Sequence, residues 1–249
     1  MLRLTLILWL TALPALAEEV VAGLSQSRIS ISTNFDGSEI LIFGAVKREN
    51  PIVEEPPIHV LITVEGPKRP VSVRRKEKRF GIWVNIDAVE VDRAPTFYAV
   101  ATSGPWAEVI SDTEDLRHRV STLRAIRSVG ATIQGSQDFT DALIRIRAGN
   151  DLYQTNIGAV ALSEQTLFNT SVRLPANLTE GDYKARFFLT RGGRVIDTHE
   201  TVIAVQKVGL ERFLFRLAHD QPLMYGLMSL AIAIAAGWGA SALFRFLRN

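Results

Sequence analysis

The sequence predicts a mainly β protein, an antiparallel sandwich with a helical insertion, followed by a single membrane-spanning helix. Short segments rich in β-branched residues recur between Arg28 and Gln206 and are bounded by Pro, Gly and Asn, as in sandwiches and barrels. Near the C-terminus, residues 223–244 include no charged side chain. A helix of that length, rising about 1.5 Å per residue, can cross a hydrocarbon core of about 30 Å.

The N-terminal segment has the pattern of an export signal. Arg3 precedes an apolar run over residues 4–13, and Ala15 and Ala17 form a small-x-small cleavage pattern. The alternative is a first transmembrane anchor, but the apolar run is much shorter than the ~20 residues that a span needs. We therefore predict a signal peptide over residues 1–17, cleaved after Ala17.

The signal and the span together predict the topology. Once the signal is removed, the mature chain starts outside the cytoplasm, and the span leaves the C-terminus inside. Arg245 and Arg248 then lie on the inner side, as the positive-inside rule prefers. The predicted parts are the signal peptide 1–17, an exported domain 18–207 with a helical insertion at about 105–150, a juxtamembrane helix 208–221, a transmembrane helix 222–245 and a tail 246–249.

A period of two marks the strands of the exported domain. Ile29 and Ile31 alternate with serines, and strand patterning resumes at Ile157 after the insertion. Two glycines between Arg191 and Arg194 predict a hairpin turn. The predicted strands cover residues 28–33, 39–46, 59–65, 71–75, 82–84, 89–91, 96–102, 168–174, 183–190 and 195–206.

The period changes to that of a helix in the insertion. Ser111 or Asp112 can cap a first helix, which Gly130 would end. A second helix is predicted from Asp138 to Ala148, with Phe139 on its apolar face. The apolar positions of the first helix are Leu116, Val120, Leu123 and Ile126.

Tyr183 indicates the kind of sandwich. It follows a turn that contains Gly181 and begins a strand, which resembles the tyrosine corner of immunoglobulin-like sandwiches, although the same G-x-Y pattern also arises by chance. The chain has no cysteine, so this would be the disulfide-free form. The predicted fold class is therefore an immunoglobulin/fibronectin-like antiparallel β-sandwich.

The residues on either side of the membrane boundary carry two further patterns. Residues 209–220 are amphipathic and predict either a short helix in the headgroup layer or an outward extension of the span, with Pro222 favouring a break. Within the span, small residues recur every four positions, which either lets another helix approach closely or reflects only an Ala- and Gly-rich composition. These residues are Ser229, Ala233, Gly237 and Ser241.

Composition and motifs argue against several function classes. The formal net charge is +2 with no wide basic field, which argues against a nucleic-acid partner. Without cysteine, disulfides and thiol catalysis are excluded. Metal, hydrolase and phosphate-binding motifs are absent, although His59 and His199 both lie in predicted strands and leave a weak metal-site alternative. We therefore predict no enzyme activity and no catalytic, cofactor-binding or metal-binding residue.

One basic cluster is a candidate anionic-partner surface. It would bind anionic headgroups or an acidic partner, or else it only protects the edge of a sheet from pairing. Aromatic residues near it, among them Trp83, Phe97 and Tyr98, are expected in the core rather than on a binding platform. The cluster comprises Arg74, Arg75, Lys76, Lys78 and Arg79.

Several spaced motifs along the whole mature chain resemble one family. They include ISTNFDGSEILIFGAV from Ile31, RKEKRFGIWVN from Arg75, APTFYAVA from Ala94 and LPANLTEGDY from Leu174. These motifs are similar to those of the alphaproteobacterial putative transmembrane protein family. The resemblance implies a signal peptide, a periplasmic domain and one C-terminal helix in the bacterial inner membrane, and it supplies no catalytic residue. It also suggests a role beside permeases of the sulfite/organosulfonate exporter type.

Three functional hypotheses follow from the sequence. The leading one is a non-enzymatic, membrane-anchored periplasmic module that binds or assists a membrane partner, such as a transporter. The others are a periplasmic enzyme with an unrecognised site and a structural module of the envelope. A deep polar pocket with converging titratable groups would favour the enzyme, and an exposed apolar patch would favour the binding module.

Overall fold

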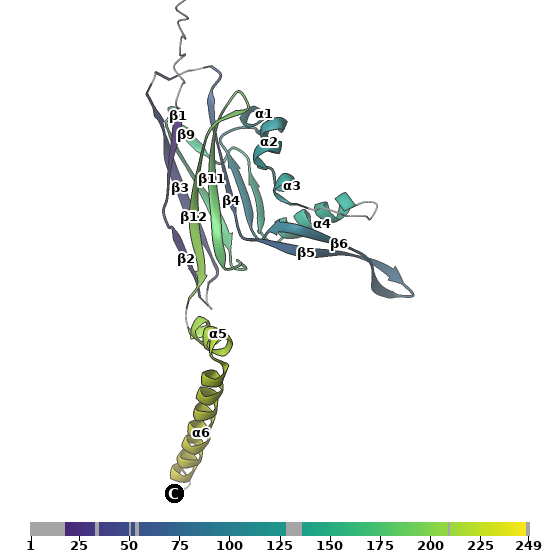
Figure 1. The fold of residues 1–249 in the computed structure, drawn as a ribbon, viewed down its shortest axis with the longest axis vertical. Helices are drawn as coiled ribbons and strands as arrows, with labels where there is room; N and C mark the ends of the chain where they lie inside the picture. The colour runs from purple at the N-terminus through teal and green to yellow at the C-terminus, as the bar shows by residue number, and fades with distance from the viewer. Residues whose placement is uncertain are drawn as a thin grey trace, which may run out of the picture.

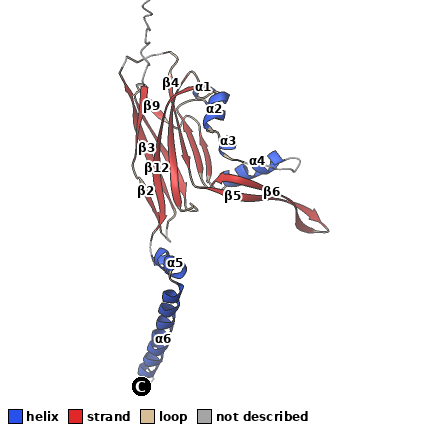
Figure 2. Cartoon of the chain, in the orientation of Figure 1, coloured by secondary structure: helices blue, strands red, loops and turns tan. Residues whose placement is uncertain are grey.

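The computed structural model describes residues 18–32, 35–49, 51–52, 55–127, 136–208 and 210–247. The predicted signal peptide and the predicted stop at Gly130 lie outside these residues. Strands make up two sheets and a separate hairpin, with short helices beside them and two helices at the C-terminal end (Figures 1 and 2). The predicted β-sandwich with one C-terminal apolar helix is confirmed.

Two sheets form the sandwich. The four-stranded sheet has the order β1 (Glu18–Leu24), β3 (Gly37–Arg48), β10 (Leu167–Pro175), β9 (Ala161–Ser163). The six-stranded sheet has the order β2 (Arg28–Ile31), β12 (Arg194–Lys207), β11 (Gly181–Arg191), β4 (Ile58–Glu65), β7 (Tyr98–Thr102), β8 (Tyr153–Asn156). Neighbouring strands pair antiparallel, apart from the edge strands β2 and β8, which pair in parallel with β12 and β7.

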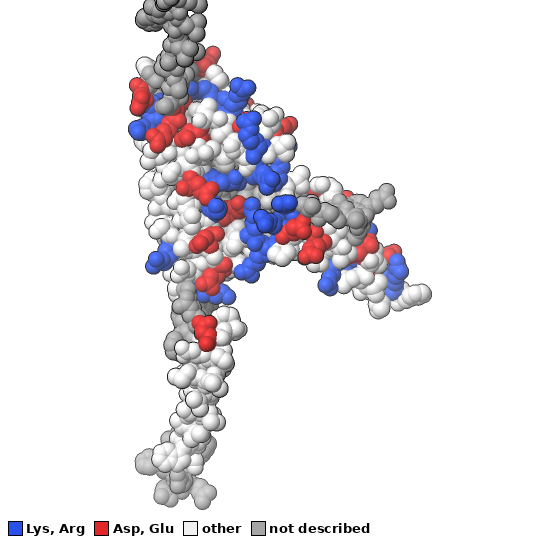
Figure 3. Space-filling view, in the orientation of Figure 1, with Lys and Arg blue, Asp and Glu red and all other residues white. Residues whose placement is uncertain are grey.

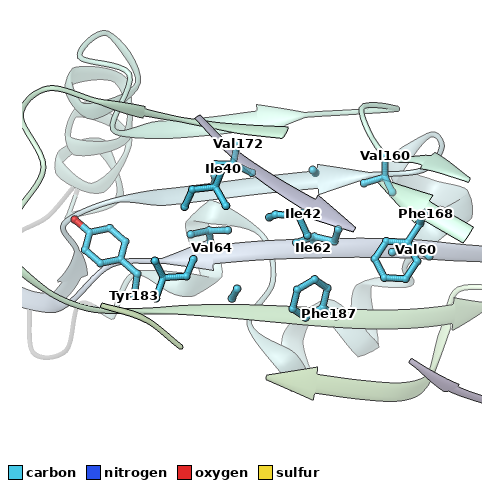
Figure 4. Close-up of a cluster of buried hydrophobic side chains, with 14 of the residues drawn as sticks. Ile40, Ile42, Val60, Ile62, Val64, Val160, Phe168, Val172, Tyr183 and Phe187 are labelled. Carbon is cyan, nitrogen blue, oxygen red and sulfur yellow. The ribbon is translucent and has the colours of Figure 1, made fainter. Parts of the chain in front are cut away.

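The core between the sheets follows from strand alternation. Along β3 and β10 every second side chain is buried, so that Ile40, Ile42 and Phe168 face the six-stranded sheet (Figure 4). The rings of Phe168 and Phe187 lie 6.3 Å apart across the core. Burying each such side chain contributes roughly 1.5–3 kcal/mol, so this layer holds the two sheets together.

The middle strands of the six-stranded sheet are buried on both faces, whereas β12 is exposed on the outer one. Their outer face packs against α1 (Trp106–Val109), α2 (Asp112–His118), α3 (Thr122–Ala125), α4 (Ser136–Ala148) and the base of the hairpin. Tyr98 lies in this second core, and its hydroxyl donates to the carbonyl of Val120 at 2.6 Å. Burial on both sides explains why β4 and β7 consist of nearly continuous apolar runs rather than alternating ones.

The first predicted helix of the insertion is wrong in length and in its buried face. Ser111 caps it as expected, but Arg119 adopts a left-handed conformation with φ 52° and ends α2. The buried carboxylate of Asp115 accepts the backbone N–H groups of Val120 and Ser121 at 3.1 and 2.7 Å, which redirects the chain into a separate α3. Leu116 is consequently 64% exposed. The second predicted helix is confirmed as α4.

The strands predicted at residues 71–75, 82–84 and 89–91 belong to one long hairpin. It consists of β5 (Lys68–Arg79) and β6 (Ile82–Pro95), which pair with each other and form a sheet of their own. The hairpin projects obliquely from the sandwich, and its tip is inclined toward the end where the C-terminal helices leave (Figure 1). The basic cluster therefore lies on a projection and not on the edge of the sandwich.

The chain leaves the sandwich through two helices. α5 (Leu210–Asp220) is followed by α6 (Pro222–Leu247), with Gln221 between them. Pro222 is the first residue of α6, where the missing N–H costs nothing because no intrahelical partner exists for it. This region thus forms two helices rather than one continuous helix.

The tyrosine corner predicted at Tyr183 is confirmed. Its hydroxyl donates to the carbonyl of Thr179 at 2.8 Å, and the ring is buried next to Phe97 at a centroid distance of 6.0 Å. Burial raises the pKa of Tyr183. The bond fixes the turn before β11, which is a central strand of the six-stranded sheet.

Tyr183→Phe should lower the free energy of unfolding by about 1–2 kcal/mol, because the carbonyl of Thr179 loses its buried donor. The control is Thr179→Ala, which keeps the accepting backbone carbonyl and should change stability little. Thermal unfolding of the detergent-solubilised chain measures both. Equal stabilities for Tyr183→Phe and the unchanged chain would contradict the corner.

Candidate membrane and partner surfaces

α6 has the length and composition of a membrane span. Its segment Pro222–Ser241 comprises 20 residues with mean hydropathy 1.6, and none of that window is buried against the rest of the described chain. Large apolar side chains such as Leu223 and Trp238 are 83% and 76% exposed. Side chains of this kind are stable only in contact with lipid or another apolar helix.

The predicted small-residue ridge lies on this exposed helix. Ser229, Ala233, Gly237 and Ser241 are all exposed, so no described part of the chain covers them. The hydroxyl of Ser229 donates to the carbonyl of Tyr225 at 2.9 Å within the helix. Its polar group is thus satisfied inside the helix, and the ridge offers close backbone approach rather than a hydrogen bond.

The root of the hairpin is held by a clamp on one backbone carbonyl. The carbonyl of Pro95, at the end of β6, accepts from the hydroxyl of Tyr153 at 2.8 Å and from Arg147 at 2.7 Å. The Arg147 guanidinium also lies 5.4 Å from the centre of the Tyr153 ring. β8 and α4 therefore hold the hairpin at a fixed point.

α4 supports one face of the hairpin beyond its root. Phe139 and Leu143 of α4 are 3% and 5% exposed, and Val89 and Val91 of β6 are buried. The guanidinium of Arg75 lies 5.3 Å from the centre of the Phe139 ring. An open groove of about 640 Å³ runs between α4 and β5, and both acidic and basic side chains line it. The hairpin is thus braced on this side.

The five residues of the basic cluster divide into two groups. Arg75 pairs with Asp87, and Arg79 pairs with Glu77 at 3.1 Å. Arg74, Lys76 and Lys78 alternate with the paired residues along β5, and Arg74 also lines the groove beside α4. None of these three is in an ion pair with another described residue. The structure therefore leaves three free cations in one row.

The tip of the hairpin is apolar and exposed. Phe80 and Gly81 form a two-residue turn between Arg79 and Ile82, and both have positive φ, 50° and 86°. Phe80 is fully exposed, and Ile82 and Trp83 are 64% and 67% exposed. In Figure 3 the tip is uncharged and basic side chains lie directly behind it.

The expectation that the nearby aromatic residues lie in the core is only partly right. Phe97 and Tyr98 are fully buried, whereas Trp83 is not, because it belongs to the projecting part of the hairpin, which no other described element covers there. The sequence expectation did not include Phe80. The sequence does indicate its position, because Phe80-Gly81 separates two strand patterns by two residues, which is the length of a tight hairpin turn.

A second exposed apolar area lies on the outer face of the four-stranded sheet. Val21, Ala45 and Leu167 are aligned across β1, β3 and β10, and Phe43 and Leu41 follow on β3. The four larger side chains of this set are about half exposed: Val21 51%, Leu41 48%, Phe43 46% and Leu167 59%. A Cβ at Gly23 would come within 2.9 Å of the Phe43 ring, so glycine makes room for that ring. We call these five residues the apolar flank.

His59 and His199, the two histidines of the metal-site alternative, each contact other groups. His59 lies 3.3 Å from the hydroxyl of Ser103, and His199 lies 5.9 Å from the Phe187 ring, measured between centroids. Across the described ranges, no group of three or more His, Asp or Glu side chains could hold a metal ion. The weak metal-site alternative at His59 and His199 thus gains no support.

A family model described as Putative transmembrane protein (Alph_Pro_TM) matches residues 19–246. The chain belongs to this family. Its membership agrees with the resemblance seen in the motifs, and the single apolar helix α6 agrees with a membrane protein. A search of curated proteins found no match.

Tyr153→Phe should change how stability depends on alkaline pH. Burial raises the pKa of Tyr153 to about 12, from 10.0. Because this pKa is higher in the folded state, the protonated Tyr153 hydroxyl stabilises the fold. Its contribution to the free energy of unfolding is complete below pH 10 and is lost as the pH rises toward 12. The variant should lose about 1 kcal/mol at neutral pH and then fall less steeply than the unchanged chain above pH 10. Parallel curves above pH 10, measured by thermal unfolding, would contradict this.

Proposed function

We propose that this chain is a non-enzymatic accessory module, anchored in the bacterial inner membrane, that binds an integral membrane partner through its periplasmic sandwich. The apolar flank carries the proposal. In an antiparallel sheet with one covered face, the outer face is ordinarily polar, yet here Val21, Phe43 and Leu167 cluster on it. Exposed apolar areas of this kind mark interaction sites.

The membrane anchor supports an integral partner over a soluble one. α6 confines the chain to the plane of the membrane, where any other membrane protein meets it at a high effective concentration. β1 and β3 run along the side of the sandwich above α5, so the apolar flank points sideways from the anchor (Figure 1). A neighbour in the same membrane that extends on the same side can reach it. A permease of the sulfite/organosulfonate exporter type is the first partner to test.

Site-directed photocrosslinking tests the apolar flank. We place a benzophenone amino acid at Phe43 and, as the matched control, at Thr198, which is exposed on β12 of the other sheet. After irradiation of intact membranes, Phe43 should give an adduct to an integral membrane protein, identified by mass spectrometry, and Thr198 should not. Only intramolecular products at Phe43, or equal adducts at both positions, would overturn the proposal.

The span gives a second, separate test. Gly237→Leu adds a bulky side chain to the small-residue ridge and should weaken recovery of the partner, because a second helix could no longer approach closely. The control is Ala235→Leu, which places the same bulk about 200° around the helix. Equal recovery with both variants would exclude docking along the ridge.

A further inference from the structure

We propose that the tip of the β5–β6 hairpin inserts into the headgroup layer of an anionic bilayer and gives the chain a second membrane contact besides α6. The tip comprises Phe80, Ile82 and Trp83, and the three free cations Arg74, Lys76 and Lys78 lie behind it. This contact needs lipid alone, so it stands independently of the protein partner proposed above.

The turn itself carries the first observation. Phe80 occupies a left-handed conformation that bulky L-residues rarely adopt, at a position where Asn or Gly is preferred. Its ring is fully exposed and finds no packing in the described part of the chain that would offset this strain. Strained residues of this kind occur at functional sites. Entry into an apolar layer would remove this exposed ring from water and so offset the backbone strain.

The order of residues along the hairpin matches the layers of a bilayer surface. At about 3.4 Å per residue, Lys78 lies about 7 Å behind Phe80, Lys76 about 14 Å and Arg74 about 20 Å. Interfacial segments bury their apolar part about 5–10 Å into the boundary between headgroups and acyl chains. Lys78 and Lys76 would then lie at the level of the phosphates. Trp83, opposite Lys78 in the register, has the amphipathic ring that favours this interface.

The charge balance near the tip is also suited to anionic lipid. Between Arg74 and Asp87 the hairpin carries five cations and two carboxylates. Both carboxylates, Glu77 and Asp87, are already paired with Arg79 and Arg75. The row that remains free is thus purely basic. Each such cation near an anionic surface strengthens attachment.

The size of the tip favours a bilayer over an acidic protein. A stable protein interface buries about 800 Å² on each partner. A two-residue turn with two further apolar side chains forms a narrow, convex point and offers no such area. The supported root at Pro95 and the brace by α4 hold this point away from the sandwich, inclined toward the end that α5 and α6 occupy (Figure 1). The surface of the bilayer that holds α6 lies at that end.

The absence of cysteine from the chain allows a sharp test with the full mature protein. We introduce Ile82→Cys, label it with the environment-sensitive dye NBD, and reconstitute the chain at low density into vesicles of phosphatidylcholine with or without phosphatidylglycerol. The matched control is a label at Ser171→Cys on the outer face of β10. The label at Ile82 should shift to the blue and be quenched by bilayer-embedded nitroxide lipids when phosphatidylglycerol is present. The label at Ser171 should remain in water.

Substitutions then separate insertion from folding. Phe80→Asn creates an Asn-Gly turn that suits the backbone, so the hairpin stays folded while the tip loses its ring. Phe80→Asn should abolish the blue shift of the label at Ile82, and Phe80→Trp should retain that shift. Lys78→Gln and Lys76→Gln should each lower insertion about fivefold, and Arg74→Gln less, because it lies farther from the surface than a Debye length of about 8 Å. The control Lys47→Gln with Lys184→Gln removes two cations from the sandwich and should have no effect.

Three results would overturn the proposal. One is a label at Ile82 that behaves like the label at Ser171 in both kinds of vesicle. Another is insertion that persists in Phe80→Asn. The third is a shift that follows the density of protein rather than the lipid composition, which would assign the tip to a second copy of the chain.

Discussion

Helix α6, which carries no charge over residues 223–244, sets the conditions for every other part of this chain. In water its exposed side chains, among them Leu223 and Trp238, would each cost roughly 1.5–3 kcal/mol of unburied apolar surface. A bilayer removes that cost and at the same time fixes where the sandwich can be. The sandwich does not need to bind the membrane in order to stay there. Its surface can therefore serve to orient the sandwich on the membrane and to bind partners. This surface departs from that of an ordinary soluble β-sandwich in its clusters of exposed apolar side chains.

Those departures share one physical feature: apolar side chains lie where a second layer is missing. The six-stranded sheet has a second layer over its middle strands, since α1–α4 and the hairpin base cover Tyr98 and Phe188 on its outer face. On the four-stranded sheet none of the described elements forms such a layer, and Phe43 and Leu167 remain half exposed there. The hairpin tip has none either, beyond the reach of α4. The covered face gives a rigid platform, and the uncovered places are the surfaces to which we assign a protein partner and the lipid.

Much of the fold could be predicted because it depends on local patterns. Alternation at Ile40 and Ile42, the corner at Tyr183 and the uncharged span each carry their own signal in the sequence. Features set by individual side-chain contacts, which leave no periodic pattern, could not be predicted. The carboxylate of Asp115 splits a continuous helical pattern by taking the N–H groups of Val120 and Ser121. Likewise, the sequence identifies the cations Arg74 to Arg79 but not which are paired, because Asp87 reaches Arg75 only across the hairpin.

Labelling from the two sides of the membrane tests the central claim, that α6 holds the sandwich and the hairpin tip on one side with the C-terminus on the other. Single cysteines are placed at Thr198, away from the apolar flank, and at Asn249 in the otherwise cysteine-free chain. A membrane-impermeant maleimide added to intact spheroplasts should label the cysteine at position 198 and reach position 249 only after the membrane is permeabilised. Labelling of position 249 in intact spheroplasts, or protection of position 198, would contradict the account.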